Sequence, residues 1–175
     1  MMRLFIGVAP DRAARMALAE TARLLRERTN GRFSDPDLYH ITLAFLGDTA
    51  PDAVPAILDA MRHAASERRP FSISLGAVGC FGLILWRGIE PAGPVNELAQ
   101  ALRTALLAAK IQYDAKPFRA HITLARESRL PPEAGALSIP PARYPIHTLM
   151  LFESRRDGGA LRYRPCGSVS LGGGL

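Results

Sequence analysis

The most constraining feature of this sequence is a five-residue segment that occurs twice without change. His40-Ile41-Thr42-Leu43-Ala44 returns 81 positions later as His121-Ile122-Thr123-Leu124-Ala125. The same displacement aligns three flanking pairs: Gly7 with Gly88, Val8 with Ile89 and Pro10 with Pro91. Two copies are too few for a solenoid. We therefore predict a pseudo-symmetric domain of two lobes, with the repeat at approximately 3–47 and 84–128.

Strand and helix patterns alternate along the rest of the chain. Apolar or alternating runs predict strands at 4–8, 38–46, 71–75, 83–89 and 118–125. Helical spacing of apolar residues predicts helices from the N-cap Asp11 to Thr29, at 51–67 and at 95–110. The proline-rich segment 129–141 predicts a loop, and 146–153 with 161–171 predicts a hairpin across the turn 156–159. We expect an α+β fold with residues 1–175 in one domain, antiparallel sheets lining a central cleft and helices outside.

Strand geometry gives the repeated segment a chemical meaning. Alternate side chains of a strand share a face, so the Ile and Leu of each copy point into a lobe while the His and Thr point away. A pseudo-twofold axis would then set His40 and Thr42 opposite His121 and Thr123 across a cleft. One neutral imidazole can take a proton from a nucleophile while the other, protonated, gives one to the leaving oxygen. The Thr hydroxyls can donate hydrogen bonds to phosphoryl oxygens.

Two other uses of these histidines compete with catalysis. A single His-x-Thr in a strand is usually structural, but its duplication at matched positions favours a functional pair. Metal binding needs more ligands than two histidines, and no third His or convergent carboxylate lies at ligand spacing near either motif. We therefore expect no metal.

Two arginines flank the second motif. Arg119 shares the strand parity of His121, so we expect it to reach a phosphate in the cleft. Arg126 is five positions from His121 and faces away unless a bulge or the strand end intervenes. For Arg126 a phosphate contact and a surface ion pair are both open. The matching position of the first copy is Phe45, for which the core is favoured over base stacking.

Composition bears on partners and location. Twenty-two Lys and Arg against sixteen Asp and Glu give a net charge of +6, which favours nucleic acid or another phosphate-bearing partner, although an arginine-rich composition alone could produce it. Cys80 and Cys166 form neither a metal-ligand spacing nor a disulfide framework. No apolar run approaches the roughly 20 residues that span a bilayer, and the first residues do not form a signal peptide. We expect a cytoplasmic monomer without a membrane partner.

Four segments carry a family resemblance: MRLFI (2–6), HITLAFLG (40–47), KPFRAHITLAR (116–126) and LFES (151–154). Together they resemble the two-histidine (2H) phosphoesterase superfamily, whose mark is one His-x-Thr/Ser-x motif in each lobe. Within it the chain is similar to the bacterial and archaeal RNA 2′,3′-cyclic phosphodiesterases, also called 2′-5′ RNA ligases. The segments keep the family's order and spacing over nearly the whole chain.

The resemblance implies an activity and two roles. It implies a hydrolase that opens the terminal 2′,3′-cyclic phosphate of RNA to a 2′-phosphomonoester without a metal or a nucleotide cofactor. His40 would be the proton donor and His121 the acceptor that activates water. The residues alone do not say which histidine takes which role. Two alternatives stay open: a phosphoesterase acting on small cyclic nucleotides or 2′-5′ linkages, with weak reversal as a ligase, and a non-catalytic RNA- or nucleotide-binding module. Departures from the family pattern at 33–39 and 79–82 fall at the expected cleft rim and bear on substrate preference.

Overall fold

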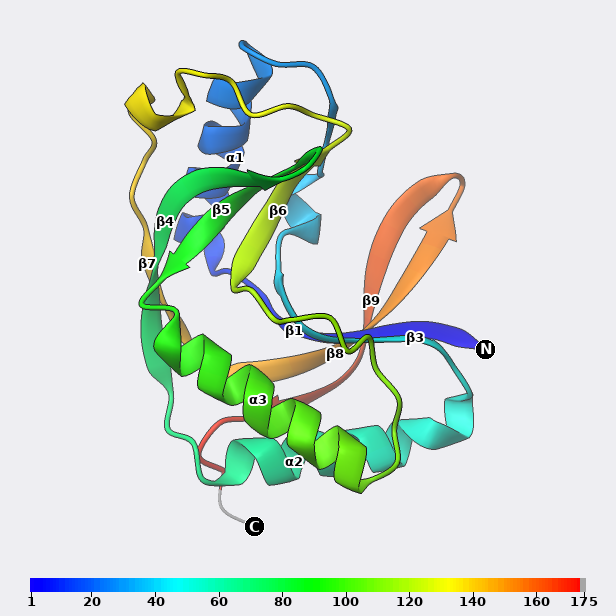
Figure 1. The fold of residues 1–175 in the computed structure, drawn as a ribbon. Coiled ribbons are helices and arrows are strands. Elements are labelled where there is room, and N and C mark those ends of the chain that lie inside the picture. Colours follow the sequence, from blue (N-terminus) through cyan, green and yellow to red (C-terminus); the bar gives the residue numbers. More distant parts are fainter. Residues whose placement is uncertain (174–175) are drawn as a thin grey trace.

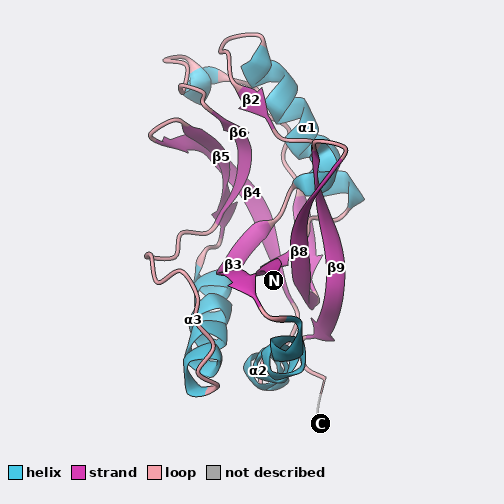
Figure 2. Cartoon of the chain, turned by 90° about the vertical axis from the view of Figure 1, so that its right-hand side faces the viewer, coloured by secondary structure: helices cyan, strands magenta, loops and turns pink. Residues whose placement is uncertain are grey.

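The computed structural model describes residues 1–173, which form two antiparallel sheets with three helices packed on them (Figures 1 and 2). The first sheet has the order β3-β1-β8-β9. Its strands are β1 (Met2–Val8), β3 (Ile41–Thr49), β8 (Thr148–Asp157) and β9 (Ala160–Ser170). The second sheet has the order β2-β6-β5-β4-β7. Its strands are β2 (Arg32–Phe33), β4 (Phe71–Phe81), β5 (Ile84–Glu90), β6 (His121–Arg126) and β7 (Arg143–Ile146). The predicted α+β class and the antiparallel sheets are confirmed.

Two of the three helices pack on the sheet opposite to the one they follow. They are α1 (Arg12–Arg26), α2 (Val54–Ser66) and α3 (Gly93–Ala108), with single turns η1 (Pro36–Leu38), η2 (Pro51–Ala53) and η3 (Ala134–Ala136). Helix α1 follows β1 of the first sheet but packs on β6 and β7 of the second, whereas α3 follows β5 of the second sheet and packs on β3 of the first. Figures 1 and 2 show α2 and α3 together at one end of the molecule and α1 at the other. Helix α2 follows β3 and packs on β8 and β9 of the same sheet. Because α1 and α3 each pack on the opposite sheet, each half depends on the other for part of its core.

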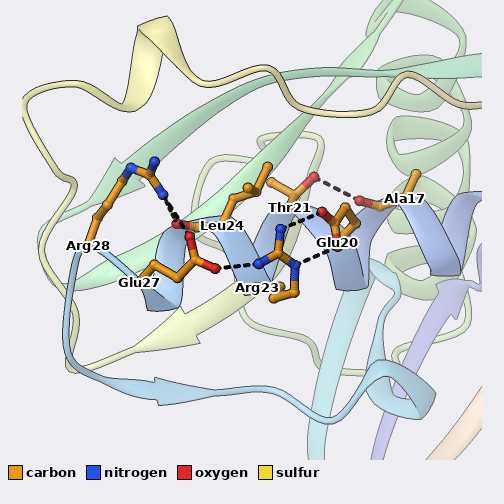
Figure 3. Close-up of polar contacts among 7 residues, drawn as sticks. All are labelled: Ala17, Glu20, Thr21, Arg23, Leu24, Glu27 and Arg28. Carbon is orange, nitrogen blue, oxygen red and sulfur yellow. Dashed lines mark hydrogen bonds and ion pairs between the residues drawn. The ribbon is translucent and has the colours of Figure 1, made fainter.

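Helix α1 illustrates how the sequence sets a local element. The Asp11 carboxylate accepts a hydrogen bond from the Ala14 N–H at 2.8 Å and caps the first turn. Apolar residues at helical spacing, such as Leu18 and Leu25, are completely buried. The opposite face carries the ion pairs of Arg23 with its neighbouring glutamates (Figure 3). Exposed pairs of this kind add little stability, so the buried face holds the helix in place. Among the described residues, no helix is long and apolar enough to cross a membrane.

The repeated segments lie on equivalent strands and carry the same bulge. In the β1–β3 ladder Ile6 faces Ala44 and Gly7 faces Thr42, which leaves Leu43 without a partner. In the β5–β6 ladder the facing residues skip Leu124 in the same way: Leu85 with Ala125 and Trp86 with Thr123. A bulge reverses the alternation of side chains beyond it. The residues that follow each motif therefore return to the face of the His and Thr.

The flanking part of the predicted repeat is out of register. Gly7 lies opposite Thr42, but Trp86 rather than Gly88 lies opposite Thr123. The glycines that the sequence aligned, Gly7 and Gly88, are thus two residues apart in the two ladders. Two strands also begin later than predicted, at Ile41 and His121, because η1 and a loop precede them. The strand predicted at 71–75 continues to Phe81, and the short edge strands β2 and β7 were not predicted.

Candidate active site

A cavity of about 510 Å³ opens between the two sheets and contains both repeated motifs. The motif side chains that line it are His40 and Thr42 from the first copy and His121 and Thr123 from the second. Their neighbours Ile41, Leu43, Ile122 and Leu124 are completely buried on the other side of the strands. Burying a side chain of this size contributes roughly 1.5–3 kcal/mol, so four such anchors hold the polar pairs at the cleft surface. We refer to this cavity as the cleft.

Each histidine is oriented by the carbonyl two residues before it. His40 Nδ1 donates to the Leu38 oxygen at 2.7 Å, and His121 Nδ1 donates to the Arg119 oxygen at 2.6 Å. Because a carbonyl only accepts, both neutral imidazoles carry their proton on Nδ1. Nε2 is therefore the atom that can exchange a proton with a substrate in both copies.

The surroundings of the two Nε2 atoms differ. His40 Nε2 lies 2.8 Å from Thr42 Oγ, which donates its proton to that nitrogen. His121 Nε2 makes no hydrogen bond to another described residue. The His40 ring packs on Phe5 and Tyr163, at centroid distances of 4.7 and 5.1 Å. The repeat thus gives both histidines one orientation, but only His40 is held by the Thr of its motif.

Burial sets the protonation of both histidines in the free protein. It lowers the pKa of His40 to about 4, against the opposing effect of the hydrogen bond to Leu38 and with help from the positive charges of His121 and Arg126. Burial also lowers the pKa of His121, with Arg126 adding to the effect. Both imidazoles are therefore neutral at pH 7. A phosphate anion bound beside them would raise both pKa values, because a negative charge favours imidazolium.

Gly7 leaves the space that the first motif needs. A Cβ atom on this residue would lie 2.6 Å from the Ile41 carbonyl oxygen and 3.6 Å from His40 Cδ2. A side chain here would push the backbone of β1 away from the bulge beside His40. The close approach of β1 and β3 at this point therefore requires glycine.

The flanking arginines occupy different places. The bulge at Leu124 turns Arg126 into the cleft, where its guanidinium has no carboxylate partner within 4.0 Å among residues 1–173. Arg119 does not line the cleft; its guanidinium lies 5.3 Å from the centre of the Phe81 ring. The parity argument for Arg119 assumed a strand from 118, whereas β6 begins at His121. Phe45, favoured for the core, instead lines the cleft, because the equivalent bulge turns it outward.

Much of the cleft wall was not identified from the sequence. Four of these residues come from the β8–β9 hairpin: Ser154, Arg156, Leu161 and Tyr163. Others come from β2 and from the segment that follows it, including Arg32, Phe33 and Asp35. The departure noted at 33–39 therefore does lie at the cleft, whereas 79–82 contributes nothing to its lining. Alternation along the predicted hairpin was the one signal that could have found the first group. In the described part of the chain, no three His, Cys, Asp or Glu side chains are grouped to hold a metal ion.

Comparison with known proteins places this chain in a family. A model described as the 2′-5′ RNA ligase superfamily matches residues 10–158. An RNA 2′,3′-cyclic phosphodiesterase from Thermus thermophilus is 31% identical over 153 residues, covering 79% of this chain and 77% of that protein. One from Geobacillus stearothermophilus is 39% identical over 105 residues, which are 55% of this chain and only 33% of that relative's length.

Solved structures agree over the full length of the fold. A crystal structure of a protein from Thermus thermophilus superimposes with a TM-score of 0.80 at 27% identity, covering 98% of this chain and 99% of that one. Escherichia coli LigT in complex with 3′-AMP superimposes with a TM-score of 0.74 at 25% identity, covering 97% of each chain. With a family model that matches most of its residues, the chain belongs to the 2′-5′ RNA ligase superfamily.

Proposed function

We propose that this protein hydrolyses the terminal 2′,3′-cyclic phosphate of RNA to a 2′-phosphomonoester, with His40 and His121 as its acid and base. One observation carries the proposal: two histidines with the same Nδ1 anchor present Nε2 in a single cleft between the sheets. The relatives named RNA 2′,3′-cyclic phosphodiesterase support the choice of substrate. The net charge of +6 suits a polyanionic partner.

In the proposed reaction the two imidazoles act on opposite sides of one phosphorus. Neutral His121 takes a proton from water through Nε2 as the water oxygen bonds to phosphorus. Protonated His40 gives its proton to the departing 3′ oxygen, so the phosphate stays on the 2′ oxygen. The family resemblance assigns these roles, and an Nε2 free of hydrogen bonds on His121 suits a base.

Binding of the substrate would prepare the acid. His40 is neutral in the free protein, so it must gain a proton before it can donate one. The negative phosphate supplies the reason, because it stabilises imidazolium within the cleft. Arg126 would hold the same phosphate, and the Thr42 and Thr123 hydroxyls would donate hydrogen bonds to its oxygens.

The proposal includes the domain organisation, cofactor requirement, oligomeric state and location of the enzyme. We propose one catalytic domain over residues 1–175 that needs no metal or cofactor and acts as a monomer. The exchange of helices between the sheets supports a single unit. Free thiols at Cys80 and Cys166 suit a reducing compartment such as the cytoplasm. Small cyclic nucleotides are a second candidate substrate, because a mononucleotide, 3′-AMP, occupies a solved relative.

The test is single-turnover hydrolysis of RNA with a 2′,3′-cyclic end, with the position of the product phosphate determined. His40→Ala and His121→Ala should each slow the reaction about 100-fold or more, the usual contribution of one acid–base partner. The double variant should lose much less than the product of the single losses, because residues that act as a unit are non-additive. Both single variants should remain folded at the assay temperature in melting curves, although His40→Ala loses the ring contacts with Phe5 and Tyr163. Near-normal rates in His40→Ala, or losses explained by unfolding, would overturn the proposal.

A further inference from the structure

We infer that Arg156 binds a second phosphate in the cleft, the phosphodiester that joins the terminal nucleotide of the RNA to the nucleotide before it. Cyclic-ended oligonucleotides are then preferred over cyclic mononucleotides. The inference rests on the proposed function and names the substrate more narrowly. The cations that line the cleft are the observation behind it.

Two of the lining charges are already neutralised. Arg32 lies 3.1 Å from a Glu127 carboxylate oxygen, and Asp35 lies 3.8 Å from a nitrogen of Arg162. Arg126 and Arg156 are the lining cations without a carboxylate within 4.0 Å among the described residues. They come from different sheets, Arg126 from β6 and Arg156 from β8. A ligand with two phosphates can place one anion on each of these guanidinium groups.

The hairpin explains how Arg156 reaches the cleft. Strand β1 pairs with β8 only as far as Glu153, and beyond it β8 pairs with β9 alone. The hairpin therefore stands clear of the other strands (Figure 1). On its cleft face Ser154 lies opposite Tyr163, and the next pair on the same face is Arg156 with Leu161. Tyr163 packs edge-on against His40, so one wall runs from the catalytic histidine to Arg156.

The length and chemistry of this wall suit one further nucleotide. Two residues along a strand span about 6.6 Å, which is the step from Ser154 to Arg156. One guanidinium nitrogen of Arg156 donates to the Gly159 carbonyl at 3.1 Å, which fixes the side chain at the hairpin turn and leaves other N–H groups free. Leu161 on this wall and Phe33 from β2 offer apolar surface to the base or sugar between the two phosphates.

The neighbouring arginine provides a matched control. Arg155 is on the same strand and has the same charge, but its side chain points to the other face. It lies 4.0 Å from both Glu153 and Asp157 and does not line the cleft. Removing Arg155 changes the net charge of the hairpin as much as removing Arg156 does. A difference between the two variants therefore reports position rather than total charge.

The experiment compares Arg156→Gln and Arg155→Gln on two substrates, a 2′,3′-cyclic-ended dinucleotide and a 2′,3′-cyclic mononucleotide. Arg156→Gln should lower kcat/KM for the dinucleotide about tenfold or more, as expected for a lost hydrogen bond to a charged group. Its loss on the mononucleotide should be at least five times smaller. For the dinucleotide, the log–log slope of affinity against salt should weaken by about 0.7, the value for one phosphate contact on a single strand. Arg155→Gln should behave as wild type on both substrates.

Equal losses on the two substrates, or equal behaviour of the two variants, would overturn the inference. Equilibrium binding of a dinucleotide and a mononucleotide that each end in a 2′-phosphate is measured in parallel. If wild type hydrolyses neither cyclic substrate, the proposed function fails. The binding measurement then still tests whether Arg156 holds a second phosphate. A selective loss of dinucleotide affinity in Arg156→Gln supports this site, and the absence of a selective loss refutes it.

Discussion

Replacing His40 with Asn removes an imidazole whose pKa the fold lowers from 6.5 to about 4. Asn is a close substitute, because its side-chain amide can donate to the Leu38 carbonyl as Nδ1 does. Between these two pKa values the unfolded chain binds a proton at position 40 and the folded protein does not. The free energy of unfolding of wild type must therefore fall as the pH falls through this window. The Asn variant lacks this contribution.

The magnitude follows from the shift. Lowering the pKa from 6.5 to about 4 corresponds to about 3 kcal/mol, of which about 2.5 kcal/mol is already lost at pH 4.5. Urea denaturation of both proteins at pH 7.5 and pH 4.5, at constant ionic strength, measures it. All other titrating groups are common to both proteins, so their contributions cancel in the difference. Wild type should lose about 2.5 kcal/mol more than the variant on acidification.

The reasoning is refuted if the stability difference between wild type and His40→Asn is the same at both pH values. That result would mean that His40 gains a proton in the folded protein as easily as in the unfolded chain. Burial in the aromatic contacts of Phe5 and Tyr163 would then not hold the imidazole neutral. The proposed charging of His40 by the substrate would lose its basis as well.

Three further outcomes are expected. Activity on a cyclic phosphate should survive excess EDTA, because two imidazoles supply both proton transfers; complete loss restored by a divalent ion would contradict the two-histidine mechanism. The pH profile of kcat/KM should be bell-shaped with its maximum below pH 6.5, because burial lowers the pKa values of both histidines in the free protein. The profile of kcat should peak at higher pH, because bound phosphate raises the same pKa values. A flat profile would count against titrating histidines. Gly7→Ala should lower the free energy of unfolding by about 1–3 kcal/mol and reduce activity. Gly88→Ala should be milder, because a Cβ there would meet its nearest atom at 3.3 Å. Equal melting temperatures of the two variants would contradict the requirement for glycine at position 7.

The repeated motif let the sequence predict the buried and polar faces of the two central strands. Ile41 and Ile122 are completely buried, while both histidines lie in the cleft. Parity failed beyond the motif, because each strand buries two successive residues, Leu and Ala, at the bulge. A strand can bury neighbours in succession only by breaking its alternation. The bulge that brings Arg126 into the cleft thus shows itself in the burial of a Leu-Ala pair, which only the structure reveals.

The remainder of the cleft depends on contacts between distant segments. The turn at Gly158-Gly159, with positive φ at both residues, already fixes the hairpin pairing of Arg156 with Leu161. The sequence could therefore predict that Arg156 pairs with Leu161. It could not predict that this face of the hairpin lines the cleft, because that depends on how β8 pairs with β1. Arg119 was misplaced for the converse reason: its direction was inferred from a strand that begins only at His121.

The proposed reaction needs two histidines that differ, while a repeat makes them alike. The shared features are the Nδ1 anchor and the bulge, which orient both Nε2 atoms in the same way. The difference comes from what each copy places beside them: Thr42 engages His40 Nε2, and the position after the bulge is Phe45 in one copy and Arg126 in the other. In the proposed reaction Arg126 holds the phosphate from β6, the strand that also carries His121, and His121 activates the attacking water. The departing oxygen must then leave toward His40, because attack and departure lie in line at phosphorus. Under this proposal duplication supplies two matched proton carriers, and Arg126 is the cation that only one of the two copies provides.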